Sequence, residues 1–295
     1  MGKILIITGG GIKHLKPFEE NAKVLNLDVT TASFSAINFQ TKESKIVPHI
    51  KSIPLESFDL IYIRLVGKRY EDLSLLASFA KDKNIKIVDR IYQNSKYARL
   101  PLSKSLETKL LIKKNIPLPK TYYASVENIV ENAPRIFGFP FVIKGTTGKQ
   151  GHEVWSPRDK KELHNLAKSI LTKEKEGKRF LAQEFIKASQ RIRVFVVGGK
   201  ALAAITRPTR WRKRFTKKPP LREPLMPVPG DIATLAADSC RGLSIDIAGV
   251  DIICDDETEK RYVLEVNSAP RWASIAKDTH VNIEGEILKY LASLV

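Results

Sequence analysis

Cysteine is scarce in this chain of 295 residues, which has only Cys240 and Cys254. Two cysteines, without an apolar N-terminal run long enough for a secretion signal, exclude the disulfide framework of a small extracellular protein. Long apolar runs are also missing, because no window approaches the roughly 18 consecutive apolar residues of a membrane-spanning helix. We therefore expect a cytoplasmic protein without a membrane partner.

Acidic residues are few relative to basic ones. The 32 Asp and Glu residues face 50 Lys and Arg residues, so the formal net charge is +18. The excess is largest in residues 98–204, which carry 21 basic and 9 acidic side chains. A further run of eight cations contains no acidic residue: Arg207, Arg210, Arg212, Lys213, Arg214, Lys217, Lys218 and Arg222. A basic balance favours anionic partners such as nucleotides, acidic peptides or RNA.

The N-terminal segment lacks the familiar glycine-rich nucleotide signatures. Gly9-Gly10-Gly11 follows a buried-strand pattern at Lys3–Thr8, but its spacing fits neither the dinucleotide-binding motif nor the P-loop. We interpret these glycines as a turn. Strand and helix patterns then alternate over Leu60–Leu65, Tyr70–Lys81 and Ile85–Asp89. This order predicts a small parallel sheet within residues 1–97.

The rest of the chain mixes both patterns. Helices are predicted near Ser103–Lys114, Lys160–Leu171, Asp231–Leu243 and Asn282–Leu294, and strands near Phe139–Lys144, Glu153–Ser156, Phe180–Ile186, Ile192–Val197, Ala201–Thr206, Ile247–Cys254 and Arg261–Asn267. Gly198-Gly199 indicates a tight hairpin turn between two of these strands. The proline-rich stretch Pro208–Pro229 reads as a long loop.

The last two predicted strands place three oxygen-bearing side chains near one point. Strand alternation puts Tyr262, Leu264 and Val266 on one apolar face that packs on the core. Glu265 and Asn267 then lie together on the other face, and antiparallel pairing brings Asp251 opposite Glu265. Hard oxygen ligands of this kind suit Mg²⁺ that holds nucleotide phosphates. From spacing alone, a solvated polar sheet face explains the same pattern equally well.

Two further segments have features of a nucleotide site. Lys144 ends a strand and precedes a loop with glycines at 145, 148 and 151, whose backbone N–H groups can cradle phosphates. An ordinary flexible loop with a surface lysine is the competing interpretation. The strand end Gln183-Glu184-Phe185 offers backbone groups that can read an adenine, although a plain core strand would look the same.

These features occur in a fixed order along the chain. A lysine at a helix start (Lys104) and a lysine before a Gly-rich loop (Lys144) are followed by Gln-Glu-Phe-Ile, Arg-Val-Phe-Val-Val-Gly-Gly-Lys, Gly-Val-Asp and Leu-Glu-Val-Asn-Ser-Ala-Pro. The ordered set resembles the ATP-grasp superfamily, and within it the RimK-like branch of carboxylate–amine ligases. That branch includes ligases that add glutamate to a ribosomal protein or to small molecules. The resemblance covers about Ala98–Val295.

The resemblance implies an α/β chain with an ATP-grasp fold and an N-terminal pre-ATP-grasp parallel-sheet domain. The N-terminal domain would span residues 1–97 and the ATP-grasp domain residues 98–295. Within the latter, a lid lobe would cover about 118–182 and a metal-binding core lobe about 183–295. Residues 1–97 match the family only in their β/α pattern.

The resemblance also assigns roles to individual residues. ATP would be held by Lys104, Lys144, Thr146, Thr147, Gly148, Gly151, Gln183, Glu184 and Phe185. The metal ligands for Mg²⁺ (or Mn²⁺) would be Asp251, Glu265 and Asn267. Arg193 would be the catalytic residue beside the transferring phosphoryl group. Arg207, Arg210, Arg212 and Arg214 would bind substrate.

The activity implied is ATP- and Mg²⁺-dependent ligation of a carboxylate to an amine through an acyl phosphate. An amino acid such as glutamate would be added to a peptide, protein or small-molecule acceptor, an acidic peptide or protein tail among them. The chain departs from the family pattern at Arg191, where an Asp usually holds the ribose, and at Ser103, where an Asp usually precedes the lysine. The usual Arg-Ser-Asn stretch is replaced by the basic residues 208–215.

The predicted loop that contains the basic residues 208–215, called the basic loop below, admits two functional interpretations. As a clamp for an acidic acceptor, its arginines would bind carboxylates through paired hydrogen bonds. As a nucleic-acid patch, its cations would meet phosphates while Trp211 and Phe215 stack on bases. The second interpretation describes a basic nucleic-acid or ribosome-associated protein that retains a non-catalytic ATP-grasp shell, with RNA as its partner. A plain solvated loop is the third alternative.

Overall fold

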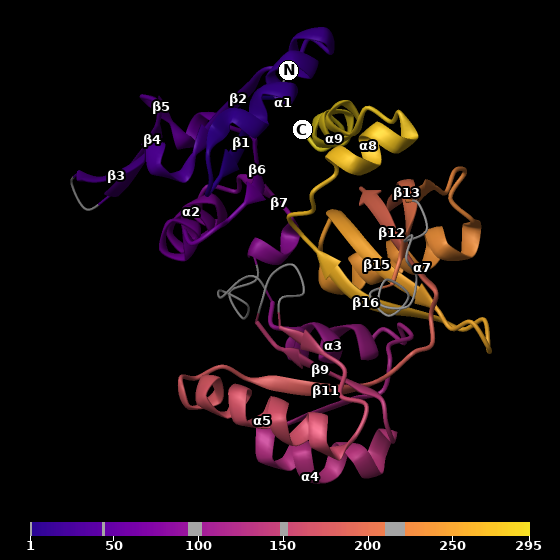
Figure 1. Ribbon diagram of the computed structural model, residues 1–295. Helices are drawn as coiled ribbons and strands as arrows, with labels where there is room; N and C mark the ends of the chain where they lie inside the picture. The colour runs from indigo at the N-terminus through magenta and orange to yellow at the C-terminus, as the bar shows by residue number, and fades with distance from the viewer. Residues whose placement is uncertain (1, 43–44, 94–101, 148–152, 210–221) are drawn as a thin grey trace.

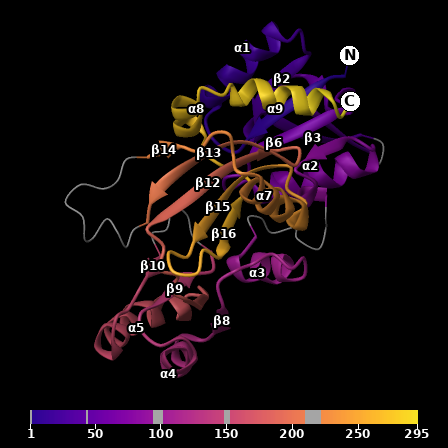
Figure 2. The ribbon, with the colours of Figure 1, turned by 90° about the vertical axis from the view of Figure 1, so that its right-hand side faces the viewer.

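The structure is a computed structural model that describes residues 2–42, 45–93, 102–147, 153–209 and 222–295. Its strands form four sheets. In Figures 1 and 2 the N-terminal sheet lies at the top, the largest sheet in the middle and a smaller α/β lobe at the bottom. No helix among the described residues has the length and apolar character to cross a membrane.

The N-terminal sheet is parallel, as the β-then-α pattern predicts. Its strand order is β2-β1-β6-β7, with both neighbours of β1 parallel to it. The elements are β1 (Ile4–Thr8), α1 (Lys16–Val24), β2 (Val29–Ser33), β6 (Leu60–Leu65), α2 (Tyr70–Asp82) and β7 (Lys86–Val88). Every residue of β1 is buried, because a parallel sheet has both faces covered. A second, antiparallel sheet that the sequence analysis did not predict comprises β3 (Ile37–Lys42), β4 (Lys45–Ile50) and β5 (Ile53–Pro54).

The smaller lobe is a four-stranded sheet, in the order β10-β9-β11-β8, with two helices on it. Its elements are β8 (Thr121–Ala124), α4 (Val126–Phe137), β9 (Phe141–Gly145), β10 (Val154–Trp155), α5 (Lys160–Lys175) and β11 (Phe180–Glu184). We call residues 121–184 the lid lobe. It has a hydrophobic core of its own, formed by side chains such as Ile129, Phe141, Leu163 and Phe180.

The largest sheet is antiparallel and has the order β14-β13-β12-β15-β16. Its strands and surrounding helices are α3 (Lys104–Ile112), β12 (Gln190–Val197), β13 (Lys200–Pro208), β14 (Glu223–Pro224), α7 (Gly230–Leu243), β15 (Ile247–Cys254), β16 (Arg261–Asn267), α8 (Ala273–Thr279) and α9 (Ile283–Ala292). Gly198 and Gly199 both have positive φ, as the predicted hairpin turn between β12 and β13 requires.

The N-terminal sheet and the largest sheet share their hydrophobic interior. One buried cluster joins Ile61 and Ile63 of β6 to Val194 of β12 and Val250 of β15. A second joins Phe18 of α1 to side chains of β12, β13 and α9. These two sheets therefore form one body, and the lid lobe is attached to it with a separate core.

Candidate functional site

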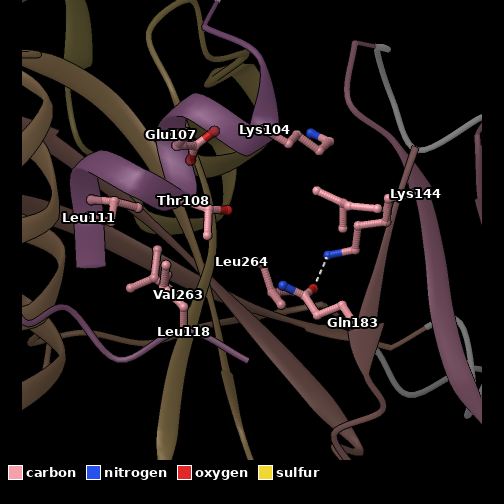
Figure 3. A pocket seen from close by; sticks show the side chains of 10 residues that line it. Lys104, Glu107, Thr108, Leu111, Leu118, Lys144, Gln183, Val263 and Leu264 are labelled. Carbon is pink, nitrogen blue, oxygen red and sulfur yellow. Dashed lines mark hydrogen bonds between the residues drawn. The ribbon is translucent and has the colours of Figure 1, made fainter. Parts of the chain in front are cut away.

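A pocket lined by both charged and apolar side chains lies where the lid lobe meets the body. It is lined by Lys104, Glu107, Thr108, Leu111, Leu118, Lys144, Leu181, Gln183, Val263 and Leu264. Figure 3 shows the α3 side chains on one side of this pocket, with Lys144 and Gln183 of the lid sheet on the other. The pocket thus draws on segments of the chain that are far apart in sequence.

Lys104 is held at the first turn of α3. The N-cap residue Ser103 accepts a hydrogen bond at Oγ from the Leu106 backbone N–H at 3.3 Å, so the helix begins at Lys104. The Lys104 backbone N–H donates to the Thr146 carbonyl at 2.9 Å. Its Nζ donates to Glu265 Oε2 at 2.9 Å. The helix start is therefore tied both to the glycine-rich loop and to β16.

Lys144 projects into the pocket from β9. Its Nζ donates a hydrogen bond to Gln183 Oε1 at 2.6 Å, and Gln183 Nε2 donates in turn to Thr121 Oγ1 at 2.9 Å. Burial, reinforced by the neighbouring charge of Lys104, lowers the pKa of Lys144 to about 8. The charged form of Lys144 is therefore destabilised in the pocket, and a bound anion would stabilise it.

The three predicted oxygen ligands converge. Asp251 of β15 pairs directly with Glu265 of β16, and Gly249 pairs with Asn267. Asn267 Nδ2 donates to Glu265 Oε1 at 3.0 Å. Burial alone would raise the pKa of Glu265, but the Lys104 charge and these hydrogen bonds lower it to about 2. The face is only partly solvated, since Asp251 is buried and Glu265 is partly buried, and the metal-ligand role of these residues stays a prediction.

One detail of the strand alternation is wrong. The register shifts between Asp251 and Ile252, so that Ile252 pairs with Val263 while Asp251 pairs with Glu265. Leu264 is therefore the extra residue of a β-bulge, which interrupts the alternation of faces. Val263 and Val266 are the residues in the core, while Leu264 lines the pocket. The bulge turns Leu264 to the face on which Glu265 lies.

Arg193 lies next to this oxygen set. It pairs across β12 and β15 with Asp251, to which it donates from Nε and, at 2.5 Å, from Nη2. Among the described residues, no group of three His, Cys, Asp or Glu side chains is arranged to hold a metal ion. The residue types nevertheless suit a hard divalent cation, because two carboxylates and an amide side chain lie on adjoining strand positions. Their charges are balanced by Arg193 and Lys104.

Glu107 is a residue of the site that the sequence analysis missed. It lies one turn after Lys104 in α3, is buried, and accepts a hydrogen bond at Oε1 from the Val266 backbone N–H at 2.6 Å. Burial raises the pKa of Glu107 to about 7. The available signal was its place with Leu111 on the buried face of α3, where an acidic residue is unusual.

The remaining nucleotide-site predictions are only partly visible. Thr146 is buried and donates its backbone N–H to the Arg179 carbonyl at 2.9 Å, whereas Thr147 is exposed. Gly148 and Gly151 lie outside the described residues. Glu184 exchanges hydrogen bonds with Lys120 through its backbone N–H and through its side chain, at 3.0 and 2.7 Å. The adenine contacts of Glu184 and Phe185 stay a prediction.

The predicted substrate arginines fall into two groups. Arg207 projects from β13 and donates from Nη2 to Ser274 Oγ at 2.9 Å. Arg210, Arg212 and Arg214 lie outside the described residues.

Known proteins resemble this chain in sequence. A family model described as the RimK-like ATP-grasp domain matches residues 102–291. A probable alpha-L-glutamate ligase of Legionella pneumophila (strain Corby) is 34% identical over 190 residues. That alignment covers 62% of this chain and 60% of the relative, so the match spans less than two-thirds of the relative's length.

Solved structures resemble it in fold. The ATP-grasp ligase PsnB complexed with a minimal precursor superposes with a TM-score of 0.74 at 14% identity, over 100% of this chain and 99% of PsnB. A Chryseobacterium gregarium RiPP-associated ATP-grasp ligase, in complex with ADP and a leader and core peptide, gives 0.70 at 18% identity, over 100% and 98%. The expected ATP-grasp fold is therefore confirmed over the full length. Together with the match across residues 102–291, it shows that the chain belongs to the RimK-like ATP-grasp family.

Proposed function

We propose that the protein is an ATP- and Mg²⁺-dependent ligase that joins a carboxylate to an amine. The observation that carries the proposal is that Lys104 and Lys144 line one pocket, while Lys104 also bonds Glu265 at 2.9 Å. Glu265 in turn is paired across the strands with Asp251 and hydrogen-bonded to Asn267. Two cations suit the phosphates of a nucleotide, and the oxygen set suits the cation that accompanies them. PsnB, which shares the fold, has a structure with Mg and ADP.

Each residue would have a distinct role in binding ATP and the metal or in phosphoryl transfer. Lys104 and Lys144 would bind the phosphate oxygens, and Asp251, Glu265 and Asn267 would hold Mg²⁺ or Mn²⁺. The metal would neutralise charge that develops on the transferring phosphoryl group. Arg193 lies at the edge of this set and would donate hydrogen bonds to the same phosphoryl oxygens. Glu184 and Phe185 would present backbone groups to the adenine.

The chemistry has two steps. A substrate carboxylate oxygen attacks the γ-phosphorus of ATP, the bond to the β,γ-bridging oxygen breaks, and ADP leaves from an acyl phosphate. The nitrogen of the amine substrate then attacks the acyl carbon. Inorganic phosphate leaves, the nitrogen loses a proton, and an amide bond remains. Lys104, Lys144 and Arg193 contribute by fixing the phosphoryl group in line with the attacking oxygen.

The substrates belong to the proposal as well. The relatives named probable alpha-L-glutamate ligases support an amino acid such as glutamate as the amine. The peptide complexes of the structural neighbours support a peptide or protein acceptor. The direct test measures ADP release by the purified chain with Mg²⁺, glutamate and a panel of acidic peptides and small carboxylic acids. Amide product, identified by mass spectrometry, must appear in step with ADP. ATP turnover without an amide product would contradict the proposal.

Replacing Glu107 by alanine is expected to weaken activity without unfolding the chain. Glu107 anchors the backbone between Glu265 and Asn267, so its loss frees the strand that carries both ligands. We expect kcat to fall by about tenfold or more, since supporting contacts of metal ligands typically contribute about 10–100-fold. Glu107→Gln keeps an acceptor oxygen and should restore most of the rate. Equal losses in both variants would show that the charge, not the hydrogen bond, matters.

Substitutions in the basic loop distinguish the acceptor-clamp interpretation from the RNA-binding interpretation. The relatives described above are named as ligases, so RNA binding has no support from them. Changing Arg210, Arg212, Lys213 and Arg214 together to alanine is expected to raise the KM for an acidic acceptor by about a hundredfold, at about 1.5–3 kcal/mol per charged hydrogen bond. The KM for ATP should hardly change. Tight, salt-sensitive binding of a short RNA by the wild type, without amide synthesis, would favour the other interpretation.

A further inference from the structure

Two arginines on the face of the largest sheet that carries Arg193 form no ion pair with any described residue. Arg191 of β12 pairs directly with Arg207 of β13 in the antiparallel register. Both lie on the face that carries Arg193 and Asp251, because residues two apart in a strand point to the same side. Like charges directly opposite each other destabilise a sheet. The fold therefore tolerates this pair at some cost to its own stability.

The carboxylates near the pair relieve the repulsion only in part, because Asp251 and Asp278 are bonded to other arginines. Arg191 forms no ion pair with any described residue, and its Nε is buried without a hydrogen-bond partner. Arg207 donates to the neutral Ser274, and burial together with the charges of Arg193 and Arg191 lowers its pKa against the opposing effect of Asp251. The other arginines nearby are already neutralised, Arg193 by Asp251 and Arg222 by Asp278. Among the described arginines of this face, Arg191 and Arg207 are thus the two without an ion-paired carboxylate.

The position of the pair relates it to the reaction. Arg191 lies two residues from Arg193, about 7 Å along an extended strand. A group bound by Arg191 would therefore be close enough to the proposed phosphoryl site for a single amino acid to reach both. Guanidinium groups bind carboxylates through two parallel hydrogen bonds. The RimK-like resemblance expects a ribose-binding Asp at position 191, but an arginine has no acceptor for ribose hydroxyls.

We propose that Arg191 and Arg207 form a binding site for a carboxylate that does not react. The inference rests on the proposed function and narrows it: one of the two substrates carries a carboxylate besides any group that takes part in amide formation. The amine substrate and the acceptor are both possible sources of this group. The site would bind a dicarboxylate more tightly than the analogue in which one carboxylate is an amide. The bound anion would also offset the repulsion between the two arginines.

The test uses glutarate as a simple dicarboxylate probe. Its binding to the full chain in the presence of ADP and Mg²⁺ is measured by calorimetry for the wild type, Arg191→Gln and Arg207→Gln. We expect glutarate to bind the wild type at least about tenfold more tightly than either variant, the smallest effect of losing one charged hydrogen bond. The matched control is Arg241→Gln, since Arg241 is already paired with Asp238 on α7. Without ligand, Arg191→Gln should unfold at no lower temperature than the wild type, because it removes a repulsion.

Kinetics then identify the source of the carboxylate. A raised KM for glutamate in Arg191→Gln, with no change for the acceptor, assigns the group to the amine substrate. The reverse pattern assigns it to the acceptor. A raised KM for ATP alone would place Arg191 on the nucleotide and overturn the inference, as would equal glutarate binding by wild type and variants. If the wild type binds glutarate through these arginines but forms no amide, the proposed function fails while the anion site remains.

Discussion

Replacing Glu265 by alanine is expected to abolish Mg²⁺-dependent ADP release while the fold survives. The carboxylate is one of two charged oxygen ligands proposed for the metal. A bound metal typically contributes several kcal/mol to stabilising a transition state, and each 1.4 kcal/mol corresponds to a factor of ten in rate. We therefore expect the rate to fall by about a hundredfold or more. The core is preserved because the neighbouring Val263 and Val266 make the buried contacts, not Glu265.

Three measurements make this prediction specific. Glu265→Gln keeps the shape and loses the charge, so it should lie close to Glu265→Ala in activity. Glu286→Ala removes an exposed carboxylate that is paired with Lys289 in α9 and should behave as wild type. Thermal unfolding of each variant shows whether the fold survives. Near-normal, metal-dependent turnover in a folded Glu265→Ala protein would rule out Glu265 as a ligand.

Replacing Lys144 by alanine is expected to weaken ATP binding by about ten- to a hundredfold. Lys144 is fixed by Gln183 at the pocket wall, and a charged hydrogen bond to phosphate contributes about 1.5–3 kcal/mol. Lys149→Ala is the natural comparison, because Lys149 follows in the same glycine-rich segment and lies outside the described residues. We expect its effect on binding, measured by nucleotide titration, to be smaller. Equal effects would mean that the phosphate site is elsewhere.

The low pKa of Lys144 makes ATP binding depend on pH. In the free protein this amine loses its proton as the pH rises through about 8, whereas the phosphates of ATP favour the ammonium form. ATP affinity should therefore be level below pH 8 and fall above it, by at most about tenfold per pH unit because one proton is involved. Lys144→Ala should abolish the dependence. The stability of the fold has the opposite pH dependence. The buried Lys144 ammonium destabilises the folded state fully below pH 8, and this destabilisation disappears once the pH exceeds the pKa of the lysine in the unfolded chain, near 10.5.

Much of the site could be predicted because its signals are local. A capped helix start presents Lys104, a strand end presents Lys144, and a two-residue period places Glu265 beside Asn267. Antiparallel pairing of adjacent strands then brings in Asp251. The resemblance to a family added the order of these signals along the chain. Each of these inferences needs only neighbouring residues or one hairpin.

The features that escaped prediction depend on contacts between distant segments. The bulge that turns Leu264 into the pocket leaves no mark in the alternation of residue types. Glu107 acquires its role only because α3 packs beside β16, more than 150 residues later. The pairing of Arg193 with Asp251 was likewise missed, since it requires the neighbouring strands β12 and β15. The sheet β3-β4-β5 escaped because prolines at 48 and 54 interrupt β4 and β5, although Ile37 and Phe39 alternate with polar residues in β3.

The separate core of the lid lobe has a consequence for turnover of the protein in the cell. Because the lid core is separate from the two buried clusters of the body, the lid has its own free energy of unfolding and can lose structure while the body stays folded. A nucleotide held by Lys144 in the lid and by Lys104 in the body would resist that event. By mass action, ATP at a concentration a hundred times its dissociation constant would add about 2.7 kcal/mol to the free energy of unfolding of the lid. The supply of ATP would then govern how readily proteases cleave this lobe.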